Sequence, residues 1–380
     1  MRALVTAEGN TATIADVPIP EPAGNEIRIQ VHSVALNPVD ALYVADQPNP
    51  DDVGRVIGSD FAGTVDEVGK DVTQWKIGDR VAGFVQGATS VNPRPGGFAE
   101  YAILEADLAI RIPTEASFEE AATFPLCSLT AAQGLFIRLG LHAPFPNPVP
   151  PENELVGESP AILIYSASTS VGLFAIELAR IARTPCGKPY RIFATASEKH
   201  HQKLLDRGVD AVFDYRSPDW PEKVYKASGG IAGALDCISE DGSTSKISQT
   251  FLESGGRIAV IRSTAWFPHG FKDKVSAIYS AVWSGLGHEI HYNGGTIPAS
   301  PSWRAFTVEF FKFLSSHPAQ FPIAHITPRL MPGGLDNITA HAFPLLGHGK
   351  VIDRDYRGSE AFLQPISAEK LVYNVNPRGA

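Results

Sequence analysis

The 380-residue sequence predicts an α/β fold of two domains, one rich in β-strands and one built on a doubly wound parallel sheet. Three observations support this prediction. Residues 1–110 form short strand-like runs separated by Gly, Pro and Asp. The middle of the chain alternates apolar strands with amphipathic helices, and its end returns to strand-like segments.

The N-terminal part predicts a β-rich, partly open barrel. Residues 26–35 (EIRIQVHSVA) alternate between apolar and polar side chains with the period of two that a half-buried strand shows. Residues 62–68 and 80–84 predict further short strands, and the pairs Val68-Gly69 and Gly78-Asp79 predict turns beside them.

The pattern changes after Glu119. Residues 119–140 predict a helix entry, an interruption at Pro125 and then an amphipathic helix. Residues 143–160 are rich in Pro and acidic side chains, which predicts an exposed connector.

The following segment has a βα pattern. The wholly apolar run 161–165 predicts a buried strand, and 171–183 (VGLFAIELARIAR) predicts an amphipathic helix. Apolar strands separated by helices are typical of a parallel sheet covered on both faces. Further strands are expected at 191–197, 211–213, 233–238 and 257–261, and further helices at 201–207 and 302–316.

The last strand-like segment is Lys370–Val375 (KLVYNV). We expect it to complete the first domain, which is then discontinuous in sequence. The first domain is therefore expected to span residues 1–128 and 317–380, and the second to span 129–316.

The charge balance limits the possible partners. The chain has 32 basic and 41 acidic side chains and a net charge of −9, which argues against nucleic acid or an anionic membrane. No run approaches the roughly 18 apolar residues of a membrane span, and the first residues lack signal-peptide features. We therefore expect a cytoplasmic protein that binds small molecules. The three cysteines, Cys127, Cys186 and Cys237, are too few and too widely spaced for a disulfide framework or a four-cysteine zinc site.

A dinucleotide site is expected where the strand at 161–165 runs through Ser166–Gly172 into a helix. The turn has the form Ala167-x-Thr169-x-x-Gly172 in place of G-x-G-x-x-G. A helix N-terminus offers free N–H groups and a positive dipole end to a pyrophosphate, and Gly172 permits close packing of helix on strand. The alternative is an ordinary strand–helix connection with Ser/Thr capping. The expected cofactor contacts are Ala167, Ser168, Thr169, Ser170 and Val171.

The end of the second parallel strand favours NADPH over NADH. An NAD site usually places Asp or Glu there to bind the ribose 2′-OH, whereas this strand ends in Ser197 and is followed by Glu198 and Lys199. Ser197 and Lys199 suit a 2′-phosphate, while an inward-pointing Glu198 would oppose it. Tyr215, after the third strand, is expected on the adenosine side or on the surface. Ile261, at the end of the strand at 257–261, is also expected to contact the cofactor.

Five motifs support a family resemblance. They are Asn37-Pro38-Val39-Asp40, Gly58–Val65 (GSDFAGTV), Gly78-Asp79-Arg80-Val81, Gly96–Tyr101 (GGFAEY) and the late Gly349-Lys350. On these motifs the chain resembles the medium-chain dehydrogenases/reductases over essentially its full length.

Further motifs make the likeness more specific. They are Phe213–Arg216 (FDYR), Ala234–Ile238 (ALDCI), the Pro-rich stretch 143–160 and Ser367–Tyr373 (SAEKLVY). With them the chain is most similar to fungal trans-acting enoyl reductases that serve highly reducing polyketide synthases. The resemblance implies a GroES-like catalytic domain and a Rossmann domain that binds NADPH. It also implies reduction of an α,β-unsaturated thioester carried by an acyl carrier domain of a polyketide synthase, or of the released product.

The resemblance also bears on zinc. Zinc-dependent relatives carry Cys at the position of Asn37 and His-Glu at the positions of Ser59-Asp60. Asn and Ser are poor zinc ligands, so we expect no metal, with Asn37 contacting the cofactor instead. Without zinc, conjugate reduction of a C=C bond suits the site better than alcohol oxidation.

The resemblance further implies which residues contact substrate. Thr130 matches a family position beside the nicotinamide and is expected to bond the thioester; the alternative is a helix residue back-bonded to the preceding turn. Trp283 is expected to line the acyl channel or else to be a core residue.

One position departs from the family. These reductases carry Lys two residues after the Asp of the Asn-Pro-x-Asp motif, where this chain has Leu42 followed by Tyr43. Leucine can neither bond an enolate nor deliver a proton. Tyr43 substitutes as the acid if its phenol reaches the pocket; the alternative is a packed aromatic. Two other functions therefore stay open: a stand-alone quinone or enone reductase, and a relative that isomerises or cyclises its substrate without net reduction.

Overall fold

The computed structural model describes residues 1–47, 53–87, 94–149, 154–155, 157–240, 242–262, 270–292, 295–356 and 358–375. The chain divides into two compact units. Unit 1 comprises Met1–Leu126, Gly287–Ser300 and Phe311–Ala380, and unit 2 comprises Cys127–Leu286 and Pro301–Phe310.

The units differ from the expected domains in their late boundaries. Residues 287–300 and 311–316, expected in the second domain, group with unit 1. The first of these segments holds the hairpin of β14 (Ile290–Tyr292) and β15 (Gly295–Ile297). Strands of three residues show too little periodicity to reveal which unit they belong to.

Unit 1 is built on a seven-stranded sheet of order β16-β17-β3-β4-β5-β7, in which β6 also pairs with β3. The predicted β-rich domain is confirmed. The C-terminal strand β17 pairs antiparallel with β3, with Tyr373 opposite Val34, so the end of the chain completes this sheet. Its strands are β3 (Glu26–Ala35), β4 (Asp60–Val68), β5 (Arg80–Phe84), β6 (Tyr101–Glu105), β7 (Ile110–Arg111), β16 (Thr327–Leu330) and β17 (Glu369–Asn374). A separate hairpin pairs β1 (Arg2–Ala7) with β2 (Thr11–Asp16).

Strand β3 organises this sheet because it pairs with β4, β6 and β17. Its alternating apolar residues Ile27, Ile29 and Val31 are all fully buried. Gly63 on β4 lies opposite Val31, and a Cβ there would lie 2.0 Å from the Gln30 carbonyl oxygen. The close approach of the two strands at this point therefore requires glycine.

The helices of unit 1 include α1 (Pro38–Ala45), α2 (Phe118–Ala122) and α9 (Phe343–Leu346). Ser117 and Glu120 form a capping box at the start of α2: the Ser117 Oγ accepts from the Glu120 N–H at 3.1 Å, and the Glu120 carboxylate accepts from the Ser117 N–H at 2.9 Å. The expected interruption at Pro125 is confirmed, because α2 ends before it and α3 (Pro125–Ala132) begins with it.

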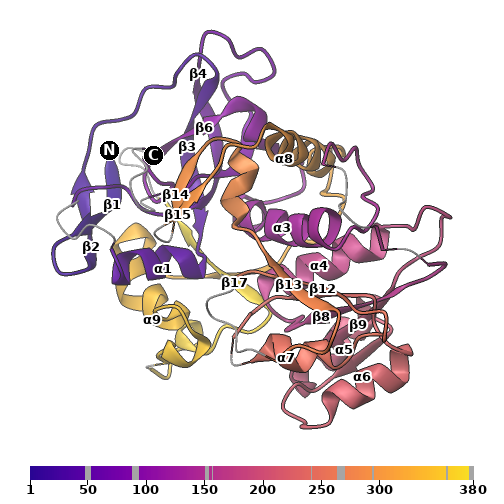
Figure 1. Cartoon of the computed structure of the whole chain (residues 1–380). Coiled ribbons are helices and arrows are strands. Elements are labelled where there is room, and N and C mark those ends of the chain that lie inside the picture. Colours follow the sequence, from indigo (N-terminus) through magenta and orange to yellow (C-terminus); the bar gives the residue numbers. More distant parts are fainter. Residues whose placement is uncertain are drawn as a thin grey trace. The chain divides into compact units, whose positions relative to one another are not determined.

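Unit 2 is built on a six-stranded parallel sheet of order β10-β9-β8-β11-β12-β13, which confirms the predicted doubly wound fold. Figure 1 shows α4 on one side of this sheet and α6 and α7 on the other. The strands are β8 (Ala161–Tyr165), β9 (Arg191–Thr195), β10 (Ala211–Phe213), β11 (Gly233–Asp236), β12 (Gly256–Val260) and β13 (Val275–Tyr279). The helices are most of α3, α4 (Ser170–Ile181), α5 (His201–Asp206), α6 (Trp220–Ser228), α7 (Ser243–Ser248) and, shared with unit 1, α8 (Pro301–Leu314).

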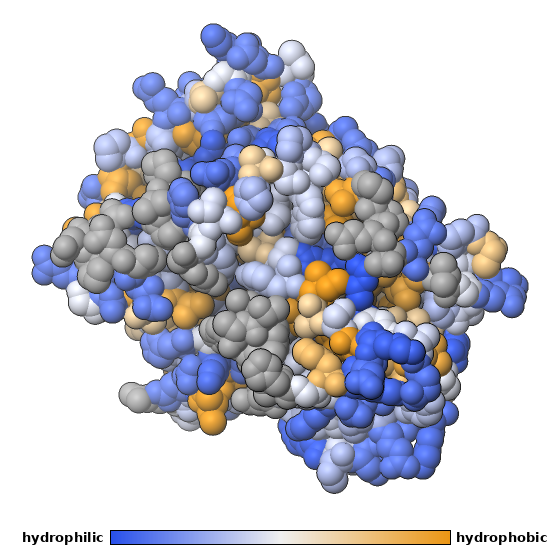
Figure 2. Space-filling model, in the orientation of Figure 1, coloured by the Kyte–Doolittle hydropathy of each residue, from blue (hydrophilic) through white to orange (hydrophobic). Residues whose placement is uncertain are grey.

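Helix α6 shows how the apolar pattern selects the buried face. Trp220 and Val224 are buried in the core between this helix and the sheet, while Glu222 and Lys226 point outward and form an ion pair at 2.5 Å. The face that Figure 2 presents is correspondingly hydrophilic over this helix. An apolar core therefore lies between the sheet and the helices α6 and α7.

The expected connector at 143–160 is not exposed throughout. Among its described residues, Phe145 is buried, and its ring centroid lies 5.4 Å from that of Phe136 and 5.4 Å from that of Phe310. The prediction was wrong here because it relied on the many Pro and acidic residues of this segment. The single aromatic side chain of Phe145 packs into unit 2 and holds the segment against it.

No helix among the described residues is long and apolar enough to span a membrane. The three cysteines carry free thiols: Cys127 and Cys237 are buried, and Cys186 is exposed.

We expect Trp220→Ala to lower the free energy of unfolding by about 3–5 kcal/mol, because it removes a fully buried side chain and leaves a cavity beneath α6. Urea unfolding measures this change. Leu205→Ala, at an exposed position on α5, is the control and should change stability by less than about 0.5 kcal/mol. Equal effects of the two substitutions would contradict the assigned core.

Candidate functional site

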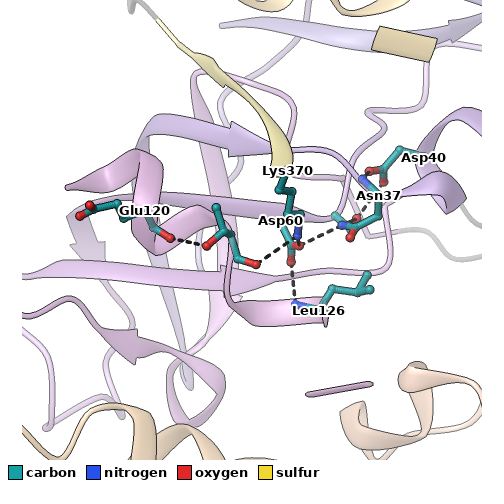
Figure 3. A network of polar contacts seen from close by, with 8 residues as sticks. Asn37, Asp40, Asp60, Glu120, Leu126 and Lys370 are labelled. Carbon is teal, nitrogen blue, oxygen red and sulfur yellow. Dashed lines mark hydrogen bonds and ion pairs between the residues drawn. The ribbon is translucent and has the colours of Figure 1, made fainter. Parts of the chain in front are cut away.

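Unit 1 contains a fully buried group of polar side chains, which we call the Asp60 cluster (Figure 3). Its members are Asn37, Asp40, Ser59, Asp60 and Lys370. They come from the start of α1, the start of β4 and the strand β17. Lys370 is 3% exposed and Asp60 is 0% exposed, so both charges are removed from solvent.

Asp60 is the centre of the cluster. Its Oδ2 accepts hydrogen bonds from the Lys370 Nζ at 2.5 Å and the Asn37 Nδ2 at 2.9 Å. Its Oδ1 accepts from the backbone N–H of Leu126 at 2.9 Å, which places a carboxylate at the N-terminus of α3. Lys370 also donates to the Thr123 carbonyl oxygen at 3.3 Å. The Asp60 side chain thereby joins three segments that lie far apart in the sequence.

Asp40 has neutral hydrogen-bond partners. Its Oδ2 accepts from the backbone N–H of Asn37 at 2.7 Å, and its Oδ1 lies 2.8 Å from the Ser59 Oγ. The Ser59 Oγ also accepts from the Asn37 Nδ2 at 3.0 Å. These bonds hold the first turn of α1 against the start of β4.

Burial governs the acidity of both carboxyl groups. Burial raises the pKa of Asp40 to about 7, opposed by hydrogen bonds from Asn37 and Ser59, and the nearby Asp60 charge raises it further. Burial also raises the pKa of Asp60, but the Lys370 ammonium is the largest opposing influence. The ionised form of Asp60 therefore has a cation in direct contact, whereas Asp40 is hydrogen-bonded to neutral groups alone.

The residues discussed for zinc lie in this cluster. The Asn37 amide is turned towards Ser59 and Asp60, so its expected contact with a cofactor stays a prediction. The carboxylate of Asp60 has the Lys370 ammonium as its cation. Within the described part of the chain, no three His, Cys, Asp or Glu side chains gather in a way that would hold a metal ion.

Leu42 and Tyr43 lie on α1, one turn beyond Asp40. Leu42 is half-buried, and Tyr43 is 9% exposed. The Tyr43 hydroxyl accepts a hydrogen bond from Arg55 NH1 at 3.3 Å. Tyr43 is therefore packed over most of its ring and hydrogen-bonded at its hydroxyl, and its role as the acid stays a prediction. No sequence pattern indicated Arg55, which lies in a loop 12 residues away.

The expected phosphate turn lies in unit 2, between β8 and α4. Thr169 is the N-cap of α4: its Oγ1 accepts from the Gly172 N–H at 3.1 Å and donates to the Ser166 carbonyl oxygen at 2.9 Å. A Cβ on Gly172 would lie 2.7 Å from the Ala167 Cα, so the helix approaches the turn closely. Thr195, at the end of β9, holds the turn by accepting from the Ser166 N–H at 2.9 Å and the Ala167 N–H at 2.8 Å.

This turn leaves two hydroxyls available for a ligand. Thr169 uses its hydroxyl in the cap, whereas the half-buried Ser168 and Ser170 have no side-chain hydrogen bond to any residue that the structure describes. Val171, also half-buried, is the second residue of the 12-residue helix α4. The turn therefore fits a pyrophosphate group, with Ser168 and Ser170 in place of Thr169 as its hydroxyl donors.

The ends of β9 and β10 carry the residues expected near the adenosine. These strands are parallel neighbours, with Phe213 opposite Thr195, so the residues just beyond them lie at one edge of the sheet. Ser197 is 9% exposed and Lys199 is exposed. Tyr215 is 38% exposed, and its ring centroid lies 6.5 Å from that of Tyr165.

Arg216 adds a cation at the same edge that sequence reasoning did not single out. Its guanidinium carbon lies 5.1 Å from the Tyr215 ring centroid, and its NH1 lies 3.7 Å from the Asp214 carboxylate. Arg216 directly follows Tyr215, so the expected place of Tyr215 near the adenosine also indicated Arg216.

Ile261 lies just beyond β12, which ends one residue earlier than expected. Its N–H donates to the Ser239 Oγ at 3.1 Å. The fully buried Asp236 accepts from the Ser239 N–H at 2.8 Å and from the Ser243 Oγ at 2.5 Å. Burial raises the pKa of Asp236 to about 6. Asp236 thereby shapes the loop after β11, and Ser239 joins that loop to the one after β12.

Thr130 and Trp283, the expected substrate residues, also belong to unit 2. Thr130 is half-buried on α3, and Trp283 is 2% exposed in the 3₁₀ helix η5 (Val282–Leu286). The buried Gln133 holds η5 by donating to the Val282 carbonyl oxygen at 3.1 Å. Thus unit 1 holds Asn37, Leu42 and Tyr43, and unit 2 holds the remaining expected site residues.

Three comparisons place this chain among known proteins. Residues 23–114 match the family model of the alcohol dehydrogenase GroES-like domain. A trans-enoyl reductase of Alternaria alternata is 31% identical over 83% of this chain and 86% of its own length, and a trans-enoyl reductase of a Penicillium species is 30% identical over 92% and 99%. The crystal structure of the CurK enoyl reductase is similar in fold, with a TM-score of 0.68, 20% identity and 98% of each chain covered.

We expect Lys370→Met to destabilise the chain by about 3–5 kcal/mol, because it leaves the Asp60 carboxylate buried without its cation. Thermal and urea unfolding measure the effect. The control is Lys226→Met, which removes an exposed ion pair and should have no measurable effect. A double variant, Asp60→Asn with Lys370→Met, should recover part of the loss. A stable Lys370→Met variant would contradict the role of this ion pair.

Proposed function

The chain belongs to the fungal trans-enoyl reductases of the medium-chain dehydrogenase/reductase superfamily, and from this we propose that it reduces the α,β-double bond of a polyketide thioester with NADPH. The enzyme would act in trans, in the cytoplasm, on an acyl chain carried by the acyl carrier domain of a polyketide synthase. The observation that carries the proposal is the phosphate turn of unit 2, whose Ser168 and Ser170 hydroxyls have no hydrogen bond to any described residue, with Lys199 and Arg216 at the sheet edge beside it.

The choice of NADPH rests on the ends of β9 and β10. A carboxylate at the end of the second strand usually binds the ribose 2′-OH of NAD. Ser197 occupies this place, and Lys199 and Arg216 bring two cations to the same edge. Hydroxyl and cationic donors suit a 2′-phosphate, whose charge a carboxylate would repel.

The nicotinamide group, when bound, supplies the hydride. The Thr130 hydroxyl is proposed to donate to the thioester carbonyl oxygen, where negative charge develops during conjugate addition. Trp283 supplies an apolar wall for the acyl chain, and η5 is held in place by Gln133. Leu42 offers no proton, so the α-carbon must receive its proton from another donor. Tyr43, oriented by Arg55, is the candidate on α1.

The direct test combines the purified chain and NADPH with an α,β-unsaturated acyl group on an acyl carrier domain. We expect the product to gain two hydrogen atoms by mass spectrometry, in proportion to the NADPH oxidised. A product of unchanged mass would replace this proposal with isomerisation or cyclisation. Equal rates with simple free enones and quinones would instead indicate a stand-alone reductase.

We expect Lys199→Ala to raise the KM for NADPH by about 10-fold or more and to leave the KM for NADH unchanged, because it removes a charge-assisted hydrogen bond to the 2′-phosphate. Steady-state kinetics with each cofactor measure the change. Lys203→Ala, exposed on α5 nearby, is the matched control and should alter neither value. A parallel rise for NADPH and NADH would show that Lys199 does not read the 2′-phosphate.

A further inference from the structure

The Asp60 cluster holds more negative than positive groups. Asp40 and Asp60 face one ammonium, that of Lys370, and all three side chains are buried. If both carboxyl groups were ionised, a net charge of −1 would lie in a region closed to solvent. Because an uncompensated buried charge is strongly unfavourable, one of the two acids is expected to hold a proton.

The hydrogen bonds assign that proton. Asp60 accepts from an ammonium, an amide and a backbone N–H, so every contact is with a donor and the group is best satisfied as a carboxylate. Asp40 contacts one backbone N–H and the Ser59 hydroxyl, which can act as donor or acceptor. A neutral Asp40 keeps both bonds, with its carbonyl accepting from Asn37 and its O–H donating to Ser59.

Among the residues that the structure describes, the charged groups that act on Asp40 are Asp60 on β4 and Lys370 on β17. Helix α9 and strand β2 also pack against α1. Helix α9 has no titratable side chain, and β2 carries Asp16 at its end. Arg55 binds Tyr43, further along α1.

We propose that Asp40 is a positioning residue that works as a neutral acid, and that its ionisation loosens the first turn of α1, the helix that carries Leu42 and Tyr43. When Asp40 is neutral, the start of α1 is bonded to Ser59 and to its own N-cap without excess charge. When it ionises, repulsion from Asp60 acts across the same contacts. The part of this proposal that concerns catalysis rests on the proposed function, which places the α1 side chains near the substrate.

The direction of the pH effect follows from burial. Burial raises the pKa of Asp40 to about 7, above the value in an unfolded chain. The stabilising contribution is therefore complete at acidic pH and is lost as the pH rises towards and through 7. A side chain of the same shape that stays neutral at every pH does not lose this stabilising contribution. Asp40→Asn is that isostere, and its amide can still accept from Asn37 and donate to Ser59.

The test compares the wild type, Asp40→Asn and Asp46→Asn, which changes an exposed carboxylate at the other end of α1. We expect the Tm of Asp40→Asn, relative to the wild type, to rise between about pH 4 and pH 7 and then to level off. Asp46→Asn should follow the wild type. If Asp40→Asn kept the wild-type dependence of Tm on pH, Asp40 would not be the titrating group and the proposal would fail.

A second readout addresses the reaction. The kcat for NADPH-dependent reduction should decline in the wild type as Asp40 ionises, whereas Asp40→Asn should keep the acidic-side kcat within about twofold and show no such decline. A loss of kcat in Asp40→Asn at every pH would overturn the neutral role. If no variant reduces an unsaturated thioester, the proposed function fails, but the Tm comparison still decides the protonation of Asp40.

Infrared spectroscopy reads the protonation of Asp40 directly when the spectrum of Asp40→Asn is subtracted from that of the wild type. The subtraction is needed because burial also raises the pKa of Asp236, to about 6. The C=O absorption of a protonated carboxyl group should be present in this difference spectrum below pH 7 and should disappear as the pH is raised. Its absence at pH 6 would contradict a neutral Asp40.

Discussion

The buried ion pair between Lys370 and Asp60 is the interaction on which the arrangement of unit 1 depends. Through Asp60 it joins the start of β4 to the N-cap of α1 and to the first turn of α3, and through Lys370 it joins them to the C-terminal strand. Taking two charges out of water is costly, and only the additional hydrogen bonds from Asn37 and Leu126 make such a pair sustainable. The ion pair therefore specifies one arrangement of these segments more than it adds stability.

Unit 2 uses neutral hydrogen bonds for the same purpose. The hydroxyls of Thr169 and Thr195 accept hydrogen bonds that fix the turn after β8. The hydroxyls of Ser168 and Ser170 make no hydrogen bond to any described residue. Asp236 and Ser239 together have the corresponding role for the loops after β11 and β12. The residues that build the cofactor edge are thus distinct from those left to bind a ligand, and this division explains why a turn with a single glycine still suits a dinucleotide.

Periodicity and turn residues predicted much of this fold. The strands 26–35, 161–165 and 211–213 have the expected bounds, because their apolar patterns are local properties of the chain. Strand β13 was missed because it lies at the edge of its sheet, half exposed and without a clear alternation. Lys370 was recognised only as part of a strand, since its partners Thr123 and Asp60 lie 247 and 310 residues away. Charge pairing over such separations leaves no periodic signal in a single sequence.

The proposed reaction is the transfer of hydride to the β-carbon of an unsaturated thioester. Incubation of the enzyme and a carrier-bound enoyl substrate with NADPH deuterated at the transferable C4 position tests it most directly. The account predicts one deuterium at the β-carbon of the saturated product, because conjugate addition delivers hydride there. A product without deuterium, or with the label at the carbonyl carbon, would contradict it.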